Sequence, residues 1–178
     1  MKKRIVSFKI KWFYVVITII ILACIPRAIE LVCGNYVFGF DQGKHWLGAK
    51  ALVVDHKIPL IGDEVGGARG FFQGPGWIYS LSIFYFLFQG NPYGGIVLMF
   101  LSGITTVVLA LWLFRKAFGT LTSGCIGLLL AISPILIESS RLTWPPHMNP
   151  PLAIISLYAV WKMITGVYMY MPVLFFVV

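Results

Sequence analysis

The residues best suited to chemistry lie in one short segment, residues 38–47. It contains a single carboxylate, Asp41, which Lys44 and His45 follow within about one helical turn. Positive charge nearby keeps a carboxylate ionised, and an ionised carboxylate can accept a proton from a reacting hydroxyl. General-base catalysis is therefore one hypothesis for Asp41. The structural alternative is a helix cap, because Asp is favoured where the first N–H groups of a helix need an acceptor.

The same segment contains two residue types that bind metals. His45 lies four residues after Asp41 and would share its side of a helix. A divalent metal held by Asp41, His45 and a third ligand from a later loop is one hypothesis, and a surface histidine is the alternative. No cofactor is assigned beyond this hypothesis, because the histidines and cysteines show no metal-ligand spacing.

Cations that could bind a phosphate occur in three polar segments. The guanidinium fork of Arg69 or Arg141 matches the oxygens of a phosphate group, and Lys44 is a candidate for the same role. The alternative for the arginines is an interfacial position with the stem in lipid. Asp63 and Glu64 are neighbours that we expect in a solvated loop, and they are the next candidates for a catalytic base if Asp41 is not one.

Composition limits the class of protein that carries these residues. The 178-residue chain is 59% hydrophobic and 11% charged, whereas soluble domains have about 25% charged residues. These values predict a helical membrane protein, because a backbone in lipid must satisfy its own hydrogen bonds. The net charge of +8 does not indicate nucleic-acid binding, since five basic residues crowd before the first apolar run, as expected for a cytoplasmic N-terminus.

Apolar runs predict an all-α polytopic fold of four to five membrane spans. A span needs about 20 residues, so the first run, 12–26, should extend through Arg27 or Ala28. The further spans are predicted at 94–114, at 121–137 with a kink at Ser133-Pro134, at 152–161 and from 171 onward. Ser123, Gly127 and Ala131 recur every four residues, a pattern typical of close helix packing in membranes.

The loops between the spans divide into two sides. Arg115 and Lys116 should be cytoplasmic, which leaves residues 27–92 and 139–150 outside and keeps the short apolar run 77–89 from crossing. Residues 41–55 predict a second juxtamembrane helix that lies on the membrane, with an apolar stripe of Leu47, Ala51 and Val54.

Four motifs in this order resemble the GT-C superfamily of polyprenol-phosphate-dependent glycosyltransferases, and most closely the protein mannosyltransferase and aminoarabinose-transferase branch. The motifs are Phe40-Asp41 after the first span, Gly74-Pro75-Gly76-Trp77-Ile78-Tyr79, Leu113-Phe114-Arg115-Lys116-Ala117-Phe118-Gly119, and Ser133-Pro134 followed by Ser140-Arg141-Leu142-Thr143-Trp144. Many relatives show paired acids after the first span, whereas Gln42 follows Asp41 here.

The resemblance implies an inverting transfer of a hexosyl or pentosyl group from a polyprenyl-phosphate-linked sugar to an acceptor at the outer face. It implies a catalytic Asp41, and it implies a multi-pass protein of the plasma membrane. We expect residues 1–178 to form one transmembrane domain, the N-terminal portion of a longer module, with a cytoplasmic tail at 1–11, a catalytic loop at 27–92 and a helix bundle at 93–178. The alternatives are a non-catalytic module that binds the lipid carrier or a partner, and a transporter.

Overall fold

Regular structure in the described residues of the computed structural model is entirely helical. The structure describes residues 2–34, 36–64 and 69–177. The helices are α1 (Lys2–Arg27), α2 (Ile29–Cys33), α3 (Phe40–Val53), α4 (Gly76–Leu87), α5 (Tyr93–Phe118), α6 (Thr120–Ile132), α7 (Pro134–Ser139), α8 (Asn149–Ile164) and α9 (Met171–Val177), with 3-10 turns η1 (Pro145–Met148) and η2 (Tyr168–Tyr170). One antiparallel bridge joins Glu64 and Phe72.

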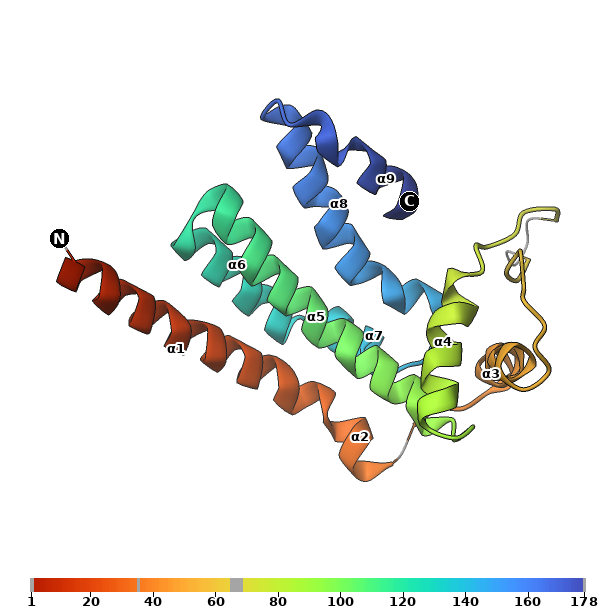
Figure 1. The fold of residues 1–178 in the computed structure, drawn as a ribbon. Coiled ribbons are helices and arrows are strands. Elements are labelled where there is room, and N and C mark those ends of the chain that lie inside the picture. Colours follow the sequence, from red (N-terminus) through yellow and green to blue (C-terminus); the bar gives the residue numbers. More distant parts are fainter. Residues whose placement is uncertain (1, 35, 65–68, 178) are drawn as a thin grey trace.

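The helix α5 is the centre of the bundle and takes part in each buried cluster. Its Val107 and Leu111 pack with Ile19 and Ala23 of α1 and Ala131 of α6. A second group of α5 residues packs against Ile154 and Tyr158 of α8, and a third packs against α3 and α4. Figure 1 shows α1, α6 and α8 arranged around α5.

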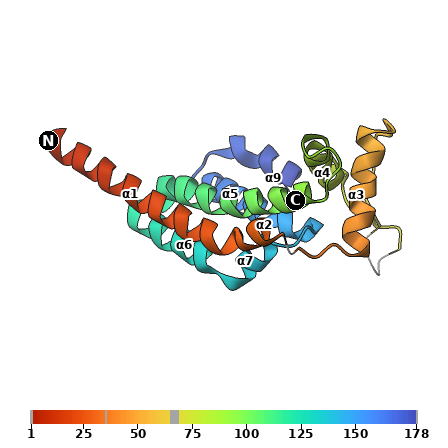
Figure 2. The ribbon, with the colours of Figure 1, turned by 90° about the horizontal axis from the view of Figure 1, so that it is seen from below.

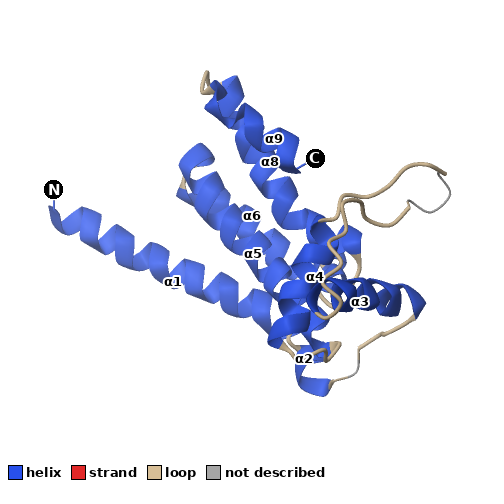
Figure 3. Cartoon of the chain, turned by 45° about the vertical axis from the view of Figure 1, so that its right-hand side comes forward, coloured by secondary structure: helices blue, strands red, loops and turns tan. Residues whose placement is uncertain are grey.

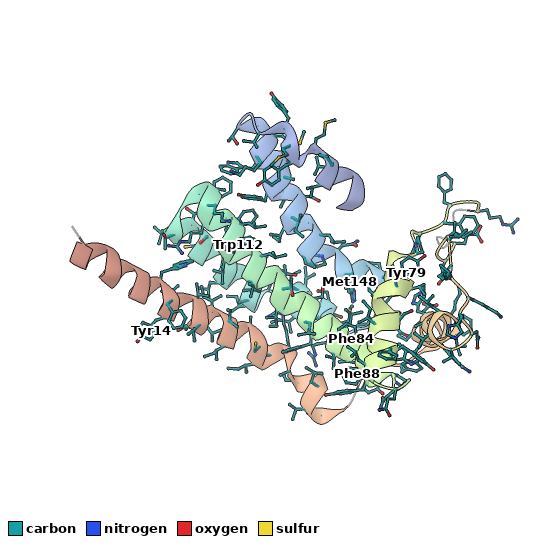
Figure 4. The ribbon with its side chains drawn as sticks, viewed as in Figure 1. Tyr14, Tyr79, Phe84, Phe88, Trp112 and Met148 are labelled. Carbon is teal, nitrogen blue, oxygen red and sulfur yellow. The ribbon has the colours of Figure 1, made fainter. Side chains whose placement is uncertain are left out.

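The helices α3 and α4 lie across one end of this bundle. Figure 2 shows α3 standing across the bundle's long axis, and Figure 3 places α3 and α4 at the same end as α2. Phe84 of α4 and Phe88, the residue that caps this helix, stack on each other with ring centroids 6.4 Å apart and lie near the start of α5 (Figure 4). The run predicted at 77–89 is therefore a separate helix at the end of the bundle, and it does not run alongside α5.

The segments predicted at 1–11 and 41–55 are both helical. Residues 2–11, predicted as a tail, form the first part of α1, which is helical from Lys2. The predicted apolar stripe faces away from the rest of the protein: Leu47 and Val54 are exposed, whereas His45, Trp46 and Ala49 are buried against neighbouring elements. Trp46 also donates from Nε1 to the carbonyl of Gly90 at 2.9 Å, which explains why this side faces inward.

The predicted kink at Ser133-Pro134 is a complete break between α6 and α7. Ser133 is extended, with φ −61° and ψ 120°, and α7 restarts at Pro134. Proline cannot donate a backbone hydrogen bond, so the carbonyls at the end of α6 need other donors. Arg27 supplies them: Nη1 donates to Ala131 O at 2.7 Å and Nη2 donates to Leu130 O at 3.0 Å.

Arg27 lies at the end of α1, as the sequence predicts for the first helix. Its side chain is 1% exposed, and its remaining contacts are Nε to Ser140 Oγ at 3.2 Å and Nη1 to Ala23 O at 3.0 Å. A Cβ on Gly103 of α5 would lie 2.8 Å from Ser140 Cβ and 3.1 Å from Arg27 Nε. The missing side chain at Gly103 therefore makes room for this arginine, which joins α1 to α6 and α7.

One helix of the described residues is long and apolar enough to cross a membrane. This helix is α5, with 26 residues. The apolar helices Trp12–Arg27, Gly76–Leu87 and Thr120–Ile132 are shorter. By length and composition, α5 is thus the one candidate span among the described residues.

The small residues of α6 do face the bundle, and this face yields a stability prediction. Ser123, Gly127 and Ala131 are buried, and a Cβ on Gly127 would lie 2.8 Å from Leu111 Cγ of α5. Gly127→Leu should lower the free energy of unfolding by about 1–3 kcal/mol through overpacking. Leu129→Ala, at a position that is 65% exposed, should cost less. Equal melting temperatures of the two variants in detergent would contradict the prediction.

Candidate functional site

The helix α3 begins two residues earlier than a capping role for Asp41 would require. Gly39 is the N-cap residue, and its N–H donates to Gln42 Oε1 at 3.0 Å. Asp41 lies inside the first turn of the helix, where a negative charge is favoured by the helix dipole. Asp41 is therefore not the N-cap residue of α3. Its carboxylate is exposed, and it forms no salt bridge or hydrogen bond with the residues that the structure describes.

Asp63 is the acid that contacts both Lys44 and His45 of α3. Its Oδ1 lies 3.0 Å from Lys44 Nζ, and its Oδ2 lies 3.0 Å from His45 Nε2. The expectation of a simply solvated loop at Asp63 is therefore wrong, because both carboxylate oxygens have partners on α3. The expectation of a surface position for His45 is also wrong, since this residue is 7% exposed.

The loop that carries Asp63 is held by its own backbone and by α4. The N–H of Gly62 donates to Gln73 O, and the N–H of Gln73 donates to Asp63 O, both at 2.8 Å. Tyr79 of α4 donates from its hydroxyl to Pro59 O. Glu64 accepts from the N–H of Gly70 through Oε1 at 2.8 Å. These contacts fix Asp63 against α3, and Asp41 is more accessible than Asp63.

The imidazole of His45 is held in one tautomer. Burial lowers the pKa of His45, an effect that outweighs the opposing attraction of the Asp63 carboxylate. The neutral ring then donates Nε2–H to Asp63 and leaves Nδ1 as an acceptor. Nδ1 is buried without a partner, as is Nε1 of Trp77, whose ring packs edge-on against the histidine at a centroid distance of 6.0 Å. A buried Nδ1 cannot take a proton from a substrate in this arrangement, so His45 positions Asp63.

The lowered pKa of His45 predicts a pH-dependent stability. Because the fold favours the neutral ring, this contribution is complete above the ordinary pKa of about 6.5 and is lost as pH falls through the lower folded value. The melting temperature should therefore fall between pH 7 and pH 5, and His45→Gln should weaken this dependence. His56→Gln, at an exposed position, is the matched control. An unchanged pH profile in His45→Gln would contradict the assignment.

A pocket of about 250 Å³ lies between α3, α4 and the loop at 57–63. Lys44, Lys57 and Asp63 supply its charged lining, and Gly48 and Ile78 supply part of its apolar wall. A Cβ on Gly48 would lie 3.1 Å from Ile78 Cδ1, so the missing side chain allows α3 and α4 to approach closely. Two lysines against one aspartate make this pocket suitable for a group with negative charge.

A second and larger pocket of about 690 Å³ lies at the same end of the bundle. It is lined by Arg141 and Glu138, by Pro134 of α7, and by Tyr36 and Val37 of the segment that leads into α3. Arg141 therefore faces a cavity, which is compatible with its predicted phosphate contact, but the cavity is not the one that Lys44 lines. Arg69 is exposed in the loop before α4 and lines neither of these two pockets.

The hypothesis of a metal held by Asp41 and His45 finds no third ligand in this arrangement of the described residues. Within residues 2–34, 36–64 and 69–177, no three His, Cys, Asp or Glu side chains come together as a metal site would require. Asp63 occupies the Nε2 side of His45 instead. The structure thus brings together Lys44 and His45 with Asp63, while Asp41 lies on the same helix and its charge acts on the pKa of His45.

Sequence reasoning missed the contact between His45 and Asp63 and the burial of Arg27. Eighteen positions separate His45 from Asp63, and no periodic pattern connects a helix with an irregular loop. The one available signal was the position of Asp63 in a loop with Pro59 and Gly62, soon after a helix that carries the adjacent basic residues Lys44 and His45. Comparisons with family models, curated proteins and solved structures found no match to this chain.

Proposed function

We propose that the chain belongs to an integral-membrane glycosyltransferase of the GT-C type, which transfers a sugar from a polyprenyl phosphate to an acceptor. The observation that carries the proposal is the accessible carboxylate of Asp41 on a helix whose Lys44 lines a cationic pocket. That helix stands across the end of an apolar bundle (Figure 2). A base and a phosphate-binding cation are the two groups that this transfer needs.

In the proposed reaction, Asp41 takes the proton of an acceptor hydroxyl while its oxygen attacks the anomeric carbon of the sugar. The bond between that carbon and the phosphate oxygen breaks, and the electron pair leaves with the polyprenyl phosphate. Attack from the face opposite the leaving group inverts the anomeric centre. Lys44, with Arg141 as the alternative, stabilises the negative charge of the departing phosphate. His45 and Asp63 hold Lys44 in place.

The proposed membrane arrangement uses α1, α5, α6–α7 and α8 as spans. The candidate span α5 has 26 residues, which extend over about 39 Å. α1 has the same number of residues, of which Trp12–Arg27 form the apolar part that would lie in the membrane. α6 and α7 together run from 120 to 139. The other three segments lie around α5, and the four segments end on two sides of the bundle (Figure 1). The side with α2, α3 and α4 would face outward, with the N-terminus in the cytoplasm.

This arrangement predicts that Tyr93 and Ala117 lie on opposite sides of the membrane. Tyr93 begins α5 and Ala117 lies in its last turn, so single cysteines placed there should be modified by an impermeant thiol reagent from opposite faces of a sealed vesicle. These single cysteines should be introduced into a variant in which the native Cys24, Cys33 and Cys125 have been replaced. Labelling of both positions from the same face would refute the proposed topology.

The function itself is tested by release of sugar from a labelled polyprenyl-phosphate donor, with purified protein in detergent and an added hydroxyl acceptor. Inverted product and free polyprenyl phosphate in equal amounts would support the proposal. Binding of the donor without any turnover, under conditions where the protein is folded, would instead favour a non-catalytic module that recognises the lipid carrier.

A further inference from the structure

We infer that the groove between α1 and α5, at the end of the bundle opposite α3 and α4, is a binding site for an acidic membrane phospholipid. The inference goes beyond glycosyl transfer, and it rests only on the membrane-spanning part of the proposed function. The site consists of the apolar groove itself and of the cations at its mouth.

The groove is a pocket of about 260 Å³ with almost wholly apolar walls. Val16 of α1 and Val108 and Leu111 of α5 form its floor and sides, and Trp12, Trp112 and Arg115 close the end nearest the N-terminus. Its size suits a segment of one acyl chain that enters from the side of the bundle. Tryptophans at this level are typical of the zone where a bilayer meets water.

Each cation at the mouth of the groove rests on one of these tryptophans. The guanidinium of Arg115 lies 5.0 Å from the centre of the Trp12 ring, and Lys116 Nζ lies 3.8 Å from the centre of the Trp112 ring. Among the described residues, neither cation forms a salt bridge with a carboxylate. The rings hold both charges beside the groove and leave N–H donors for an anionic group. Figure 4 shows Trp112 on α5, towards the end of the helix that leads into α6.

The distribution of charge in the chain selects an anion at this end. All six acidic residues, Glu30, Asp41, Asp55, Asp63, Glu64 and Glu138, belong to the opposite end, in α2, α3, the loop after it and α7. The end formed by the start of α1 and the last turns of α5 and α8 has eight basic residues and no acid: Lys2, Lys3, Arg4, Lys9, Lys11, Arg115, Lys116 and Lys162. A lipid with a neutral headgroup would leave this charge uncompensated.

A second apolar groove, between α1 and α6, makes the assignment specific. It has a volume of about 560 Å³, and none of the α1 and α6 residues that line it is charged. That groove has no feature that selects one lipid from another. The groove with Arg115 differs because an apolar wall and a fixed cation meet in one place, as a phospholipid with a negative headgroup requires.

The test measures phospholipid retained by the purified protein in neutral detergent, by native mass spectrometry, with phosphatidylglycerol and phosphatidylcholine of the same acyl chains as probes. Phosphatidylglycerol should be retained in preference. Arg115→Gln should weaken its retention about fivefold, which corresponds to about 1 kcal/mol for one cation at an anionic headgroup. Equal retention of the two lipids by the unchanged protein would overturn the inference.

Two further variants separate this site from diffuse surface charge. Lys162→Gln removes a cation at the same end that rests on the Trp161 ring at 5.1 Å but lines no part of the groove, so retention should stay the same. Val108→Trp fills the groove and keeps both cations, so retention should fall. An equal loss in Lys162→Gln, or full retention in Val108→Trp, would overturn the site. A protein recovered from cells without detergent would instead refute the membrane-spanning proposal.

Discussion

Asp41→Asn should abolish sugar transfer while the protein stays folded. The loss of a positioned general base typically lowers a rate by about 10²–10⁴, because the amide cannot accept the proton of the acceptor hydroxyl. The fold should tolerate the change, since Gly39 is the N-cap and Asp41 makes no hydrogen bond with the described residues. Loss of its favourable position near the helix dipole costs about 0.3–1 kcal/mol. The measurement is initial rate of sugar release from the lipid donor, with the melting temperature recorded on the same sample.

Asp55→Asn is the matched control for this variant. Asp55 is exposed just beyond the other end of α3, so the same chemical change there should leave the rate near normal. Transfer by Asp41→Asn within a few-fold of the unchanged protein would refute the proposed base. Asp63 would then be tested next, with the expectation of lower stability as well, because its substitution removes the partners of Lys44 and His45.

The helical class and the main elements were predictable because they depend on periodicity and on length. The apolar run of α5 is long enough to be recognised alone, and the pair Ser133-Pro134 contains its own breaking signal. The packed face of α3 was not predictable in the same way. Leu47 is more apolar than Trp46, yet Leu47 is exposed and Trp46 is buried. The indole of Trp46 donates a hydrogen bond to the carbonyl of Gly90, 44 positions away, and this contact favours the inward position of Trp46.

The candidate site was predictable in part, for a related reason. Residue type and local spacing marked Asp41, Lys44 and His45, since all three lie within about one turn of one helix. The partner of Lys44 depends on the path of a loop, which two backbone hydrogen bonds between 62 and 73 determine. Arg141 was selected for its chemistry alone, and its pocket requires the segment before α3 to pass beside α7. Tertiary contacts of this kind leave no mark on periodicity.

Arg27→Met should produce a large loss of stability in the bundle. Arg27 is a buried cation with no acidic partner among the described residues, and it donates to Leu130 O and Ala131 O at the broken end of α6. Methionine keeps the apolar stem but leaves those carbonyls without a donor. Hydrogen bonds from a charged group contribute about 1.5–3 kcal/mol each, and removal of a buried charge offsets part of that sum.

The expected net effect of Arg27→Met is a loss of about 2–4 kcal/mol, or roughly 5–15 °C in melting temperature for a chain of this size. Arg27→Lys should cause a smaller loss of stability than Arg27→Met, because one ammonium group cannot reach the two carbonyls and Ser140 Oγ in the same geometry. Arg69→Met makes the same change at an exposed loop position and should leave the melting temperature nearly unchanged. If Arg27→Met melts no lower than Arg69→Met, the arginine does not hold α1, α6 and α7 together, and the break at Ser133 must be stabilised by packing alone.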